Sequence, residues 1–150
     1  MKISTKGRYG LRALIDIAAH EDEKCVTLGS IAARQGISVN YLEQLIALLK
    51  KAGLVKSVRG PQGGYSLDKP AGDISVAYIL RILEGPFYPA DCLSSSGEKN
   101  TCGTASCENC VTKPVWEKLY NSVNNALEAF TLSDLAEDYR QAAEDVIKET

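Results

Sequence analysis

The sequence lacks the features of a membrane protein and of an exported protein. No apolar run approaches the roughly 20 residues that a transmembrane helix needs. The first six residues, MKISTK, contain no apolar segment of the kind found in a signal peptide. We therefore expect a cytoplasmic protein without membrane contact. Thiols stay reduced in the cytoplasm, so clustered cysteines there favour metal binding over disulfide bonds.

The sequence also lacks the residue combinations of an enzyme. It has one histidine, His20, and no carboxylate pair, nucleophile–base pair or phosphate-cradling loop stands out. A length of 150 residues and an ordinary composition suit one globular domain, or a small domain with an appendage. We do not expect an enzyme, and a small electron carrier or thiol oxidoreductase is the weakest alternative.

Charge is unevenly divided along the chain. Residues 1–72 carry 11 Lys and Arg against 6 Asp and Glu, whereas residues 73–150 carry 6 against 13. A basic first half joined to an acidic second half is typical of a nucleic-acid-binding domain followed by a regulatory or dimerising segment.

Apolar periodicity and capping residues predict three helices in the first 53 residues. The first runs from Thr5 to about residue 20, with an apolar stripe at every third or fourth position. Thr27 is expected to cap a short second helix that ends at Gly36, and Ser38 to cap a third helix that ends before Gly53. A short helix, a tight turn and a longer helix form the pattern of a helix-turn-helix.

A β-hairpin is expected directly after these helices. Residues 54–58 and 65–67 are strand-like, and the Gly-Pro-x-Gly-Gly tip between them allows a tight turn. A hairpin in this position turns a helix-turn-helix into a winged helix. A plain hairpin with a solvated Arg59 is the alternative.

The second half is expected to be helical around a cysteine-rich loop. A fourth helix covers about residues 75–83, a long amphipathic helix about 112–130, and Thr131 with Asp134 caps a last short helix. The long helix has nothing large in its own chain to cover it, so we expect a two-fold homodimer. We divide the chain into a winged helix-turn-helix domain (1–84), a cysteine-rich loop (85–110) and a segment with the dimerisation helix and the C-terminal helix (111–150). The fold class is mainly α with a small β-hairpin.

Three groups of residues are candidates for binding double-stranded DNA. The start of the third helix would face base edges in the major groove, where Asn and Gln pair with adenine and Glu accepts from cytosine. The wing would enter a minor groove, and the first helix would clamp phosphates; solvated surface charge is the alternative for each. The candidates are Ser38, Val39, Asn40, Tyr41, Glu43 and Gln44 on the third helix, Arg59, Gly60 and Pro61 on the wing, and Lys6, Arg8 and Tyr9 on the first helix. Ser38 can instead serve only as the helix cap.

Four cysteines, Cys92, Cys102, Cys107 and Cys110, lie in a polar loop with the spacing C-x9-C-x4-C-x2-C. The last three match the spacing of plant-type ferredoxin ligands, although the fourth ferredoxin cysteine lies downstream of them. Structural zinc sites usually use two short pairs, and only one is present. Spacing alone favours a 2Fe–2S cluster over zinc, and zinc over inert or redox-active thiols. The fifth cysteine, Cys25, is expected to be a partly buried small side chain.

Several motifs together resemble a known family. MKISTKGRYG at residues 1–10, YLEQL at 41–45, GLVKSVRGP at 53–61 and GGY at 63–65 are similar to the winged-helix repressors that include IscR, NsrR and CymR. The resemblance covers residues 1 to about 135. It implies a homodimer that binds palindromic operators and crosses over through its long helix. IscR-type members hold a 2Fe–2S cluster and regulate cluster-assembly genes, NsrR-type members sense nitric oxide, and CymR-type members, which lack the cysteine loop, are expected to match worst.

The resemblance also bears on the cluster ligands. Cys92 matches the first family cysteine and Cys110 the third, while Cys102 and Cys107 both correspond to the middle one. IscR-type proteins commonly carry a histidine three residues after the last cysteine, where this chain has Lys113. The fourth ligand is therefore Cys107 itself or a group outside the loop, with Cys107 favoured. Glu43 matches a position that tunes operator choice in IscR-type proteins, and a solvated carboxylate is the alternative.

Overall fold

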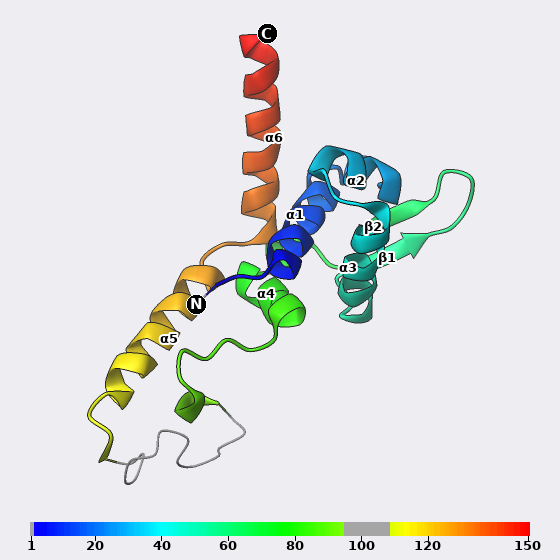
Figure 1. The fold of residues 1–150 in the computed structure, drawn as a ribbon. Coiled ribbons are helices and arrows are strands. Elements are labelled where there is room, and N and C mark those ends of the chain that lie inside the picture. The colour runs from blue at the N-terminus through cyan, green and yellow to red at the C-terminus, as the bar shows by residue number, and fades with distance from the viewer. Residues whose placement is uncertain (1, 95–108) are drawn as a thin grey trace.

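The structure is a computed structural model that describes residues 2–94 and 109–150 (Figure 1). It confirms a mainly helical chain with one small antiparallel hairpin. In chain order the described helices are α1 (Thr5–Ala19), α2 (Leu28–Gln35), α3 (Val39–Lys51), α4 (Val76–Glu84), α5 (Lys113–Glu128) and α6 (Leu132–Glu149), the strands are β1 (Val55–Val58) and β2 (Gly64–Leu67), and two short 3₁₀ turns are η1 (Ala71–Asp73) and η2 (Asp91–Leu93).

Side-chain caps set the ends of the first three helices. Thr27 accepts a hydrogen bond from the backbone N–H of Ser30 at 3.2 Å, and Ser38 accepts one from Tyr41 at 3.3 Å. Each cap satisfies an N–H that has no partner within the helix. Gly36 follows α2 with φ +64°, which only glycine adopts without strain. The predicted helix-turn-helix and its caps are confirmed.

The hairpin has the predicted position, and its strands pair in an antiparallel register. Val55 pairs with Leu67 and Val58 with Gly64, and the bridge between Val26 and Tyr65 adds two N–H···O bonds of 2.8 Å. Val55 and Leu67 are buried, so the hairpin root belongs to the core. Its tip extends away from the helices (Figure 1).

One hydrophobic core joins α1, α2, α3, α4 and the start of α6. It is built on the predicted stripes, including Leu14, Leu49 and Leu83, and on Leu132 and Ala136 of α6. Residues from the expected C-terminal segment therefore complete the core of the expected DNA-binding segment. The three-part division of the chain remains a prediction.

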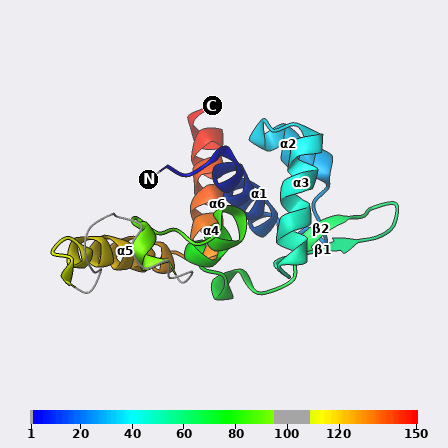
Figure 2. The same ribbon diagram turned by 60° about the horizontal axis from the view of Figure 1, so that its bottom comes forward.

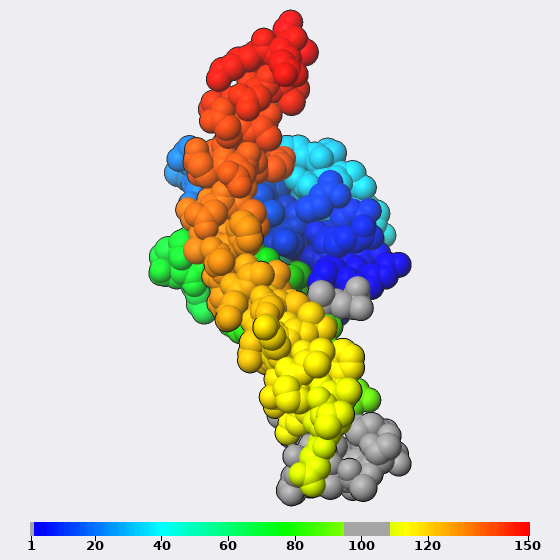
Figure 3. Space-filling view, turned by 90° about the vertical axis from the view of Figure 1, so that its left-hand side faces the viewer, coloured from blue at the N-terminus to red at the C-terminus, as the bar shows by residue number. Residues whose placement is uncertain are grey.

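The last helix differs from the prediction. We expected a short helix after Thr131, but α6 has 18 residues and is longer than α5, which has 16. The capping box between Thr131 and Asp134 is confirmed. The first half of α6 packs on α1, and the second half projects beyond the core (Figures 1 and 3). The expected length was too short because the second half of α6 has few apolar side chains, so no stripe marks it as helical. No Gly or Pro within it ends the helix earlier.

Helix α5 lies apart from the wing. It extends from one side of the core while α3 and the hairpin lie on the other side (Figures 1 and 2). None of its residues is buried. In the described part of the chain, no helix is long and apolar enough to cross a membrane.

Candidate functional site

The start of α3 presents a polar face to solvent. Asn40, Glu43 and Gln44 are exposed, and their spacing of three and four residues places them on one side of the helix. Val39 beside them is 46% exposed. The opposite side, with Leu42, Leu45, Ile46 and Leu49, is buried in the core. An anchored helix with a free amide- and carboxylate-bearing face is suited to contact base edges in a major groove.

The two helical groups of candidates lie together. The Tyr9 and Tyr41 rings meet edge to face with centroids 6.2 Å apart, so the second turn of α1 contacts the first turn of α3. Lys6 and Arg8 are exposed near this contact. Ser38 is occupied as the cap of α3, which leaves its predicted contact with DNA untested.

The wing candidates stand at the hairpin tip. Arg59, Gly60 and Pro61 are all exposed, and Gly60 has φ +123°. The turn closes through a hydrogen bond of 3.0 Å from the Gly63 N–H to the Gly60 carbonyl. Strand β1 is tied to α3 by Lys50, which donates to Ser57 at 3.0 Å. The wing is therefore held at β1 by α3, and at its tip the Gln62 carbonyl accepts a hydrogen bond from Cys25.

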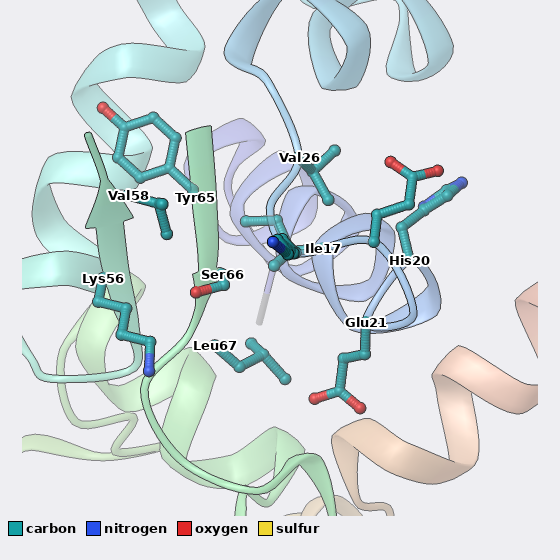
Figure 4. A pocket seen from close by; sticks show the side chains of 11 residues that line it. Ile17, His20, Glu21, Val26, Lys56, Val58, Tyr65, Ser66 and Leu67 are labelled. Atoms are coloured by element: carbon teal, nitrogen blue, oxygen red, sulfur yellow. The ribbon is translucent and has the colours of Figure 1, made fainter. Parts of the chain in front are cut away.

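An open groove of about 470 Å³ separates the hairpin from the end of α1. Lys56 and Tyr65 line it from the strands, and His20 and Glu21 line it from the end of α1 (Figure 4). Charges of both signs face it, so it lacks the single sign of charge that would select one class of ligand.

A buried polar cluster behind the helix-turn-helix was missed from the sequence. Asp16 is fully buried in α1 and receives a bidentate pair from Arg34, with N–O distances of 2.6 and 3.0 Å. Asp16 raises the pKa of Arg34 through this hydrogen-bonded pair. Gln35 donates to the same carboxylate at 2.8 Å. The available signal was an acidic residue within an apolar stretch, Leu14-Ile15-Asp16-Ile17-Ala18.

His20 belongs to the same cluster. Its Nδ1 lies 2.7 Å from the backbone oxygen of Asp16 and 3.5 Å from that residue's carboxylate. The carbonyl can only accept, so Nδ1 carries the hydrogen and donates. The only histidine of the sequence is thus engaged at the end of α1.

Two of the four loop cysteines lie within the described residues. Cys92 is in η2, which contacts α5, and Cys110 lies three residues before α5 begins. Both are half-buried free thiols. The Cys110 sulfur lies 3.2 Å from the Thr112 hydroxyl, and hydrogen bonds with Thr112 lower the pKa of the thiol. A lowered pKa favours the thiolate, which is the form that binds metals.

Cysteine thiolates are the donors that hold an iron–sulfur cluster, and Cys92 and Cys110 supply two of them. Cys102 and Cys107 fall outside the described residues. Within residues 2–94 and 109–150, no three His, Cys, Asp or Glu side chains gather as a metal site. Lys113 begins α5, and its ammonium lies 4.0 Å from Glu117. Cys25, as predicted, is half-buried, and its thiol donates to the Gln62 carbonyl at 3.0 Å near the wing.

The segment that leads to Cys92 is attached to α5. The Tyr88 and Tyr120 rings stack with centroids 5.6 Å apart. Arg81 of α4 donates to Glu128 of α5 at 3.0 Å. The described residues on both sides of the cysteine loop therefore contact the expected dimerisation helix.

A family model described as "Rrf2: Iron-dependent Transcriptional regulator" matches residues 3–138. Protein rrf2 of Nitratidesulfovibrio vulgaris is 42% identical over 138 residues, which cover 92% of this chain and 89% of the relative. Relatives are named HTH-type transcriptional regulators. These names confirm the prediction of a regulator and not an enzyme.

Two solved structures resemble the whole chain. T. potens IscR is 46% identical with a TM-score of 0.74, covering 95% of this chain and 90% of its own. CymR of B. subtilis is 39% identical, also with a TM-score of 0.74, covering 91% and 97%. We expected CymR-type proteins to match worst, and for the overall fold this expectation was wrong. The loop that distinguishes them is short relative to the shared winged-helix scaffold.

Proposed function

Because the chain belongs to the Rrf2 family of transcriptional regulators, we propose that it acts as a homodimeric repressor in the cytoplasm. It binds a palindromic operator through α3 and the wing, and a 2Fe–2S cluster modulates that binding. On the resemblance to IscR, its targets are genes for iron–sulfur cluster assembly. The chain is a regulator by family, and the operator, dimer, cluster and targets are parts of the proposal.

The exposed polar face of α3 beside α1 carries the proposal. Asn40 and Gln44 supply amides for adenine, and Glu43 supplies an acceptor for cytosine. Lys6 and Arg8 lie next to them and neutralise phosphates, which would make the affinity fall steeply with salt. The wing tip with Arg59 stands where a second, minor-groove contact can form.

The state of α5 supports a homodimer. Its apolar side chains remain in contact with water, with Val115 57% exposed, Leu119 43% and Trp116 37%. Pairing with the same helix of a second copy removes these groups from water and places two α3 helices in two-fold symmetry. Two-fold symmetry in the protein requires a palindromic operator.

The cysteine segment is proposed to hold the cluster. Cys92 and Cys110 supply two thiolates at the two ends of the loop, and Cys102 and Cys107 compete for one role or share two. Four thiolates are the usual ligand set of a 2Fe–2S cluster, which supplies a reversible, redox-sensitive group. Because both ends of the loop meet α5, ligation there biases the dimer, with a coupling of about 1–3 kcal/mol to DNA binding.

The metal content is tested by anaerobic purification with a visible spectrum and assays of iron, sulfide and zinc. We expect a coloured protein with about two irons and two sulfides per chain. A colourless protein with one zinc per chain would instead support the alternative function, a zinc-stabilised DNA-binding dimer that senses no signal. Exposure of the coloured protein to nitric oxide separates an NsrR-like role, in which DNA release follows nitric oxide, from a role that follows cluster supply alone.

DNA reading is tested with two matched substitutions. Gln44→Ala removes a base-reading amide, so we expect it to lower the affinity for a selected operator more than for random DNA. Lys6→Ala removes a phosphate contact and lowers both equally, with a weaker salt dependence. Equal effects of both substitutions on both DNAs would refute the assignment of α3 as the recognition helix.

A further inference from the structure

A chain of polar and ring contacts, buried at Asp16 and Gln35, links the C-terminal helix to the DNA-binding surface. We propose that Tyr139 of α6 is a positioning residue for α3, acting through Asp16, Gln35 and Arg12. The inference rests on the proposed DNA-binding function and adds that α6, on the far side of the core, helps determine which sequences the protein accepts.

The inner part of this chain is centred on Asp16. The Tyr139 hydroxyl lies 3.4 Å from Asp16 Oδ2 and 3.3 Å from Gln35 Nε2. Gln35 Nε2 donates to Asp16 Oδ2 at 2.8 Å. Asp16 has no exposed surface and Gln35 is 7% exposed. Three polar groups from α1, α2 and α6 therefore satisfy one another, with Asp16 and Gln35 buried and Tyr139 half-buried.

The outer part fixes the turn of the helix-turn-helix. Arg12 Nε donates to Gln35 Oε1 at 3.1 Å, and Arg12 Nη2 donates to the Gln35 backbone oxygen at 3.0 Å. Gln35 is the last residue of α2, and Gly36 makes the turn toward α3. The side-chain nitrogen of Gln35 thus contacts Tyr139 of α6, and its side-chain oxygen accepts from Arg12. The Gln35 backbone carbonyl also accepts from Arg12, which holds the start of the turn.

Arg12 extends the contacts to the DNA-binding surface itself. Its guanidinium lies over the Tyr9 ring, 5.4 Å from the centroid, and the Tyr9 ring meets Tyr41 of α3 at 6.2 Å. Tyr9 and Tyr41 are both candidates for contacting DNA. The contacts therefore run from Tyr139, through the buried carboxylate and amide, to the first turn of α3.

Burial makes these contacts sensitive to change. A buried carboxylate that loses a donor cannot replace it with water without rearrangement, because the interior is closely packed. We therefore expect loss of the Tyr139 hydroxyl to shift Gln35 and, with it, the turn that carries α3. Tyr139 lies on a helix that has no part in the proposed DNA contacts, so an effect on sequence discrimination has to pass through the protein.

The test uses Tyr139→Phe, which removes the hydroxyl and keeps the ring. A DNA duplex is first selected from a random library with the wild-type protein, and the Kd is measured for this duplex and for random DNA. We expect Tyr139→Phe to lower the ratio of the two affinities by about threefold or more, as for one lost hydrogen bond in a network. Affinity for random DNA should stay within about twofold, because no phosphate contact is lost.

Arg140→Gln is the matched control. Arg140 Nη1 donates to the Ala19 backbone oxygen at 3.3 Å, so this substitution also removes a contact between α6 and α1, one residue from Tyr139. Among the described residues, Ala19 makes no side-chain-mediated hydrogen bond to Gln35 or Arg12, so the discrimination ratio should stay at the wild-type value. Equal losses in the two variants, compared at a temperature where both are folded, would show general weakening of α6 and overturn the proposal.

A second variant tests the outer part. Arg12→Lys keeps a positive charge but loses the paired contacts to Gln35, so it should lower the ratio of the two affinities as Tyr139→Phe does. In the double variant, the fold-loss in this ratio should be smaller than the product of the two single fold-losses. If the two single fold-losses simply multiply in the double variant, or if Tyr139→Phe leaves the ratio unchanged, Tyr139 does not act through Gln35 and Arg12. If the wild-type protein selects no duplex, the proposed function fails and the inference fails with it.

Discussion

The winged-helix core and α5 are built from similar apolar stripes but end in opposite states. In α3 the stripe residues Leu42 to Leu49 are buried against α1 and α4. In α5 a stripe of comparable spacing leaves Val115 and Leu119 exposed. Apolar periodicity therefore shows that a helix has a hydrophobic face. Whether that face is buried within the same chain depends on the other elements that pack against it. The core is complete in one chain, whereas the apolar stripe of α5 is left uncovered by the described residues.

The largest effect is expected in the core. Leu14→Ala removes a fully buried side chain and should lower the free energy of unfolding by about 2–5 kcal/mol, because a cavity remains. Urea denaturation measures this loss at two protein concentrations. The loss should be the same at both if the core is complete in one chain. A loss that appears only at low concentration would contradict that view.

The second-largest effect is expected on self-association through the exposed stripe of α5. Leu119→Glu places a charge on its exposed stripe and should weaken self-association at least tenfold, or about 1.4 kcal/mol. Sedimentation equilibrium measures the change. Lys118→Glu, at the exposed neighbouring position off the stripe, is the control and should change association less. Equal behaviour of the two variants would remove α5 from the dimer interface.

The third effect compares two glycines. Gly10 packs against α4, and a Cβ built there lies 2.5 Å from Leu83 Cδ1, whereas a Cβ on Gly29 of α2 meets nothing within 4 Å. Gly10→Ala should destabilise the protein by about 1–3 kcal/mol through overpacking. Gly29→Ala should stabilise it by about 0.4–1 kcal/mol through the unfolded state. Thermal unfolding of both variants should therefore shift in opposite directions, and shifts in one direction would show that α1 does not approach α4 this closely.

The smallest effect concerns the start of α6. Hydrogen bonds from the backbone and hydroxyl of Thr131 lower the pKa of Asp134 below its ordinary value of 3.8. A lowered folded pKa means that the unfolded chain binds the proton more tightly, so the stabilisation is present above this range and lost as pH falls through the folded pKa. The stability difference between wild type and Asp134→Ala should shrink as pH is lowered toward 3. A stability difference that stays constant from pH 7 to pH 3 would contradict this role of the capping box.

Local signals predicted most of the fold. Thr27, Ser38 and Thr131 act as caps through contacts only three residues away, so the sequence alone was enough to place them. The Asp16 cluster was missed because its partners are 19 residues away in Gln35 and 123 away in Tyr139. Such pairs form only once the helices are packed. The length of α6 was missed because its second half has no core residues to give a stripe.

The candidate sites also differ in whether local sequence signals could predict them. Residues on one helix face, such as Asn40 and Gln44, could be grouped from spacing alone, and the structure adds the tyrosine contact that brings α1 beside them. The cysteine ligands depend on how a long polar loop closes. Cys102 and Cys107 both match the middle family cysteine, and both lie outside the described ranges.

The central claim is that cluster occupancy changes how this regulator binds DNA. The direct measurement is anaerobic fluorescence anisotropy with a selected operator, comparing cluster-loaded protein with the same preparation after the cluster is removed. A coupling of about 1–3 kcal/mol predicts Kd values that differ about fivefold to 150-fold. Equal Kd values for the two forms on every selected operator would contradict the claim.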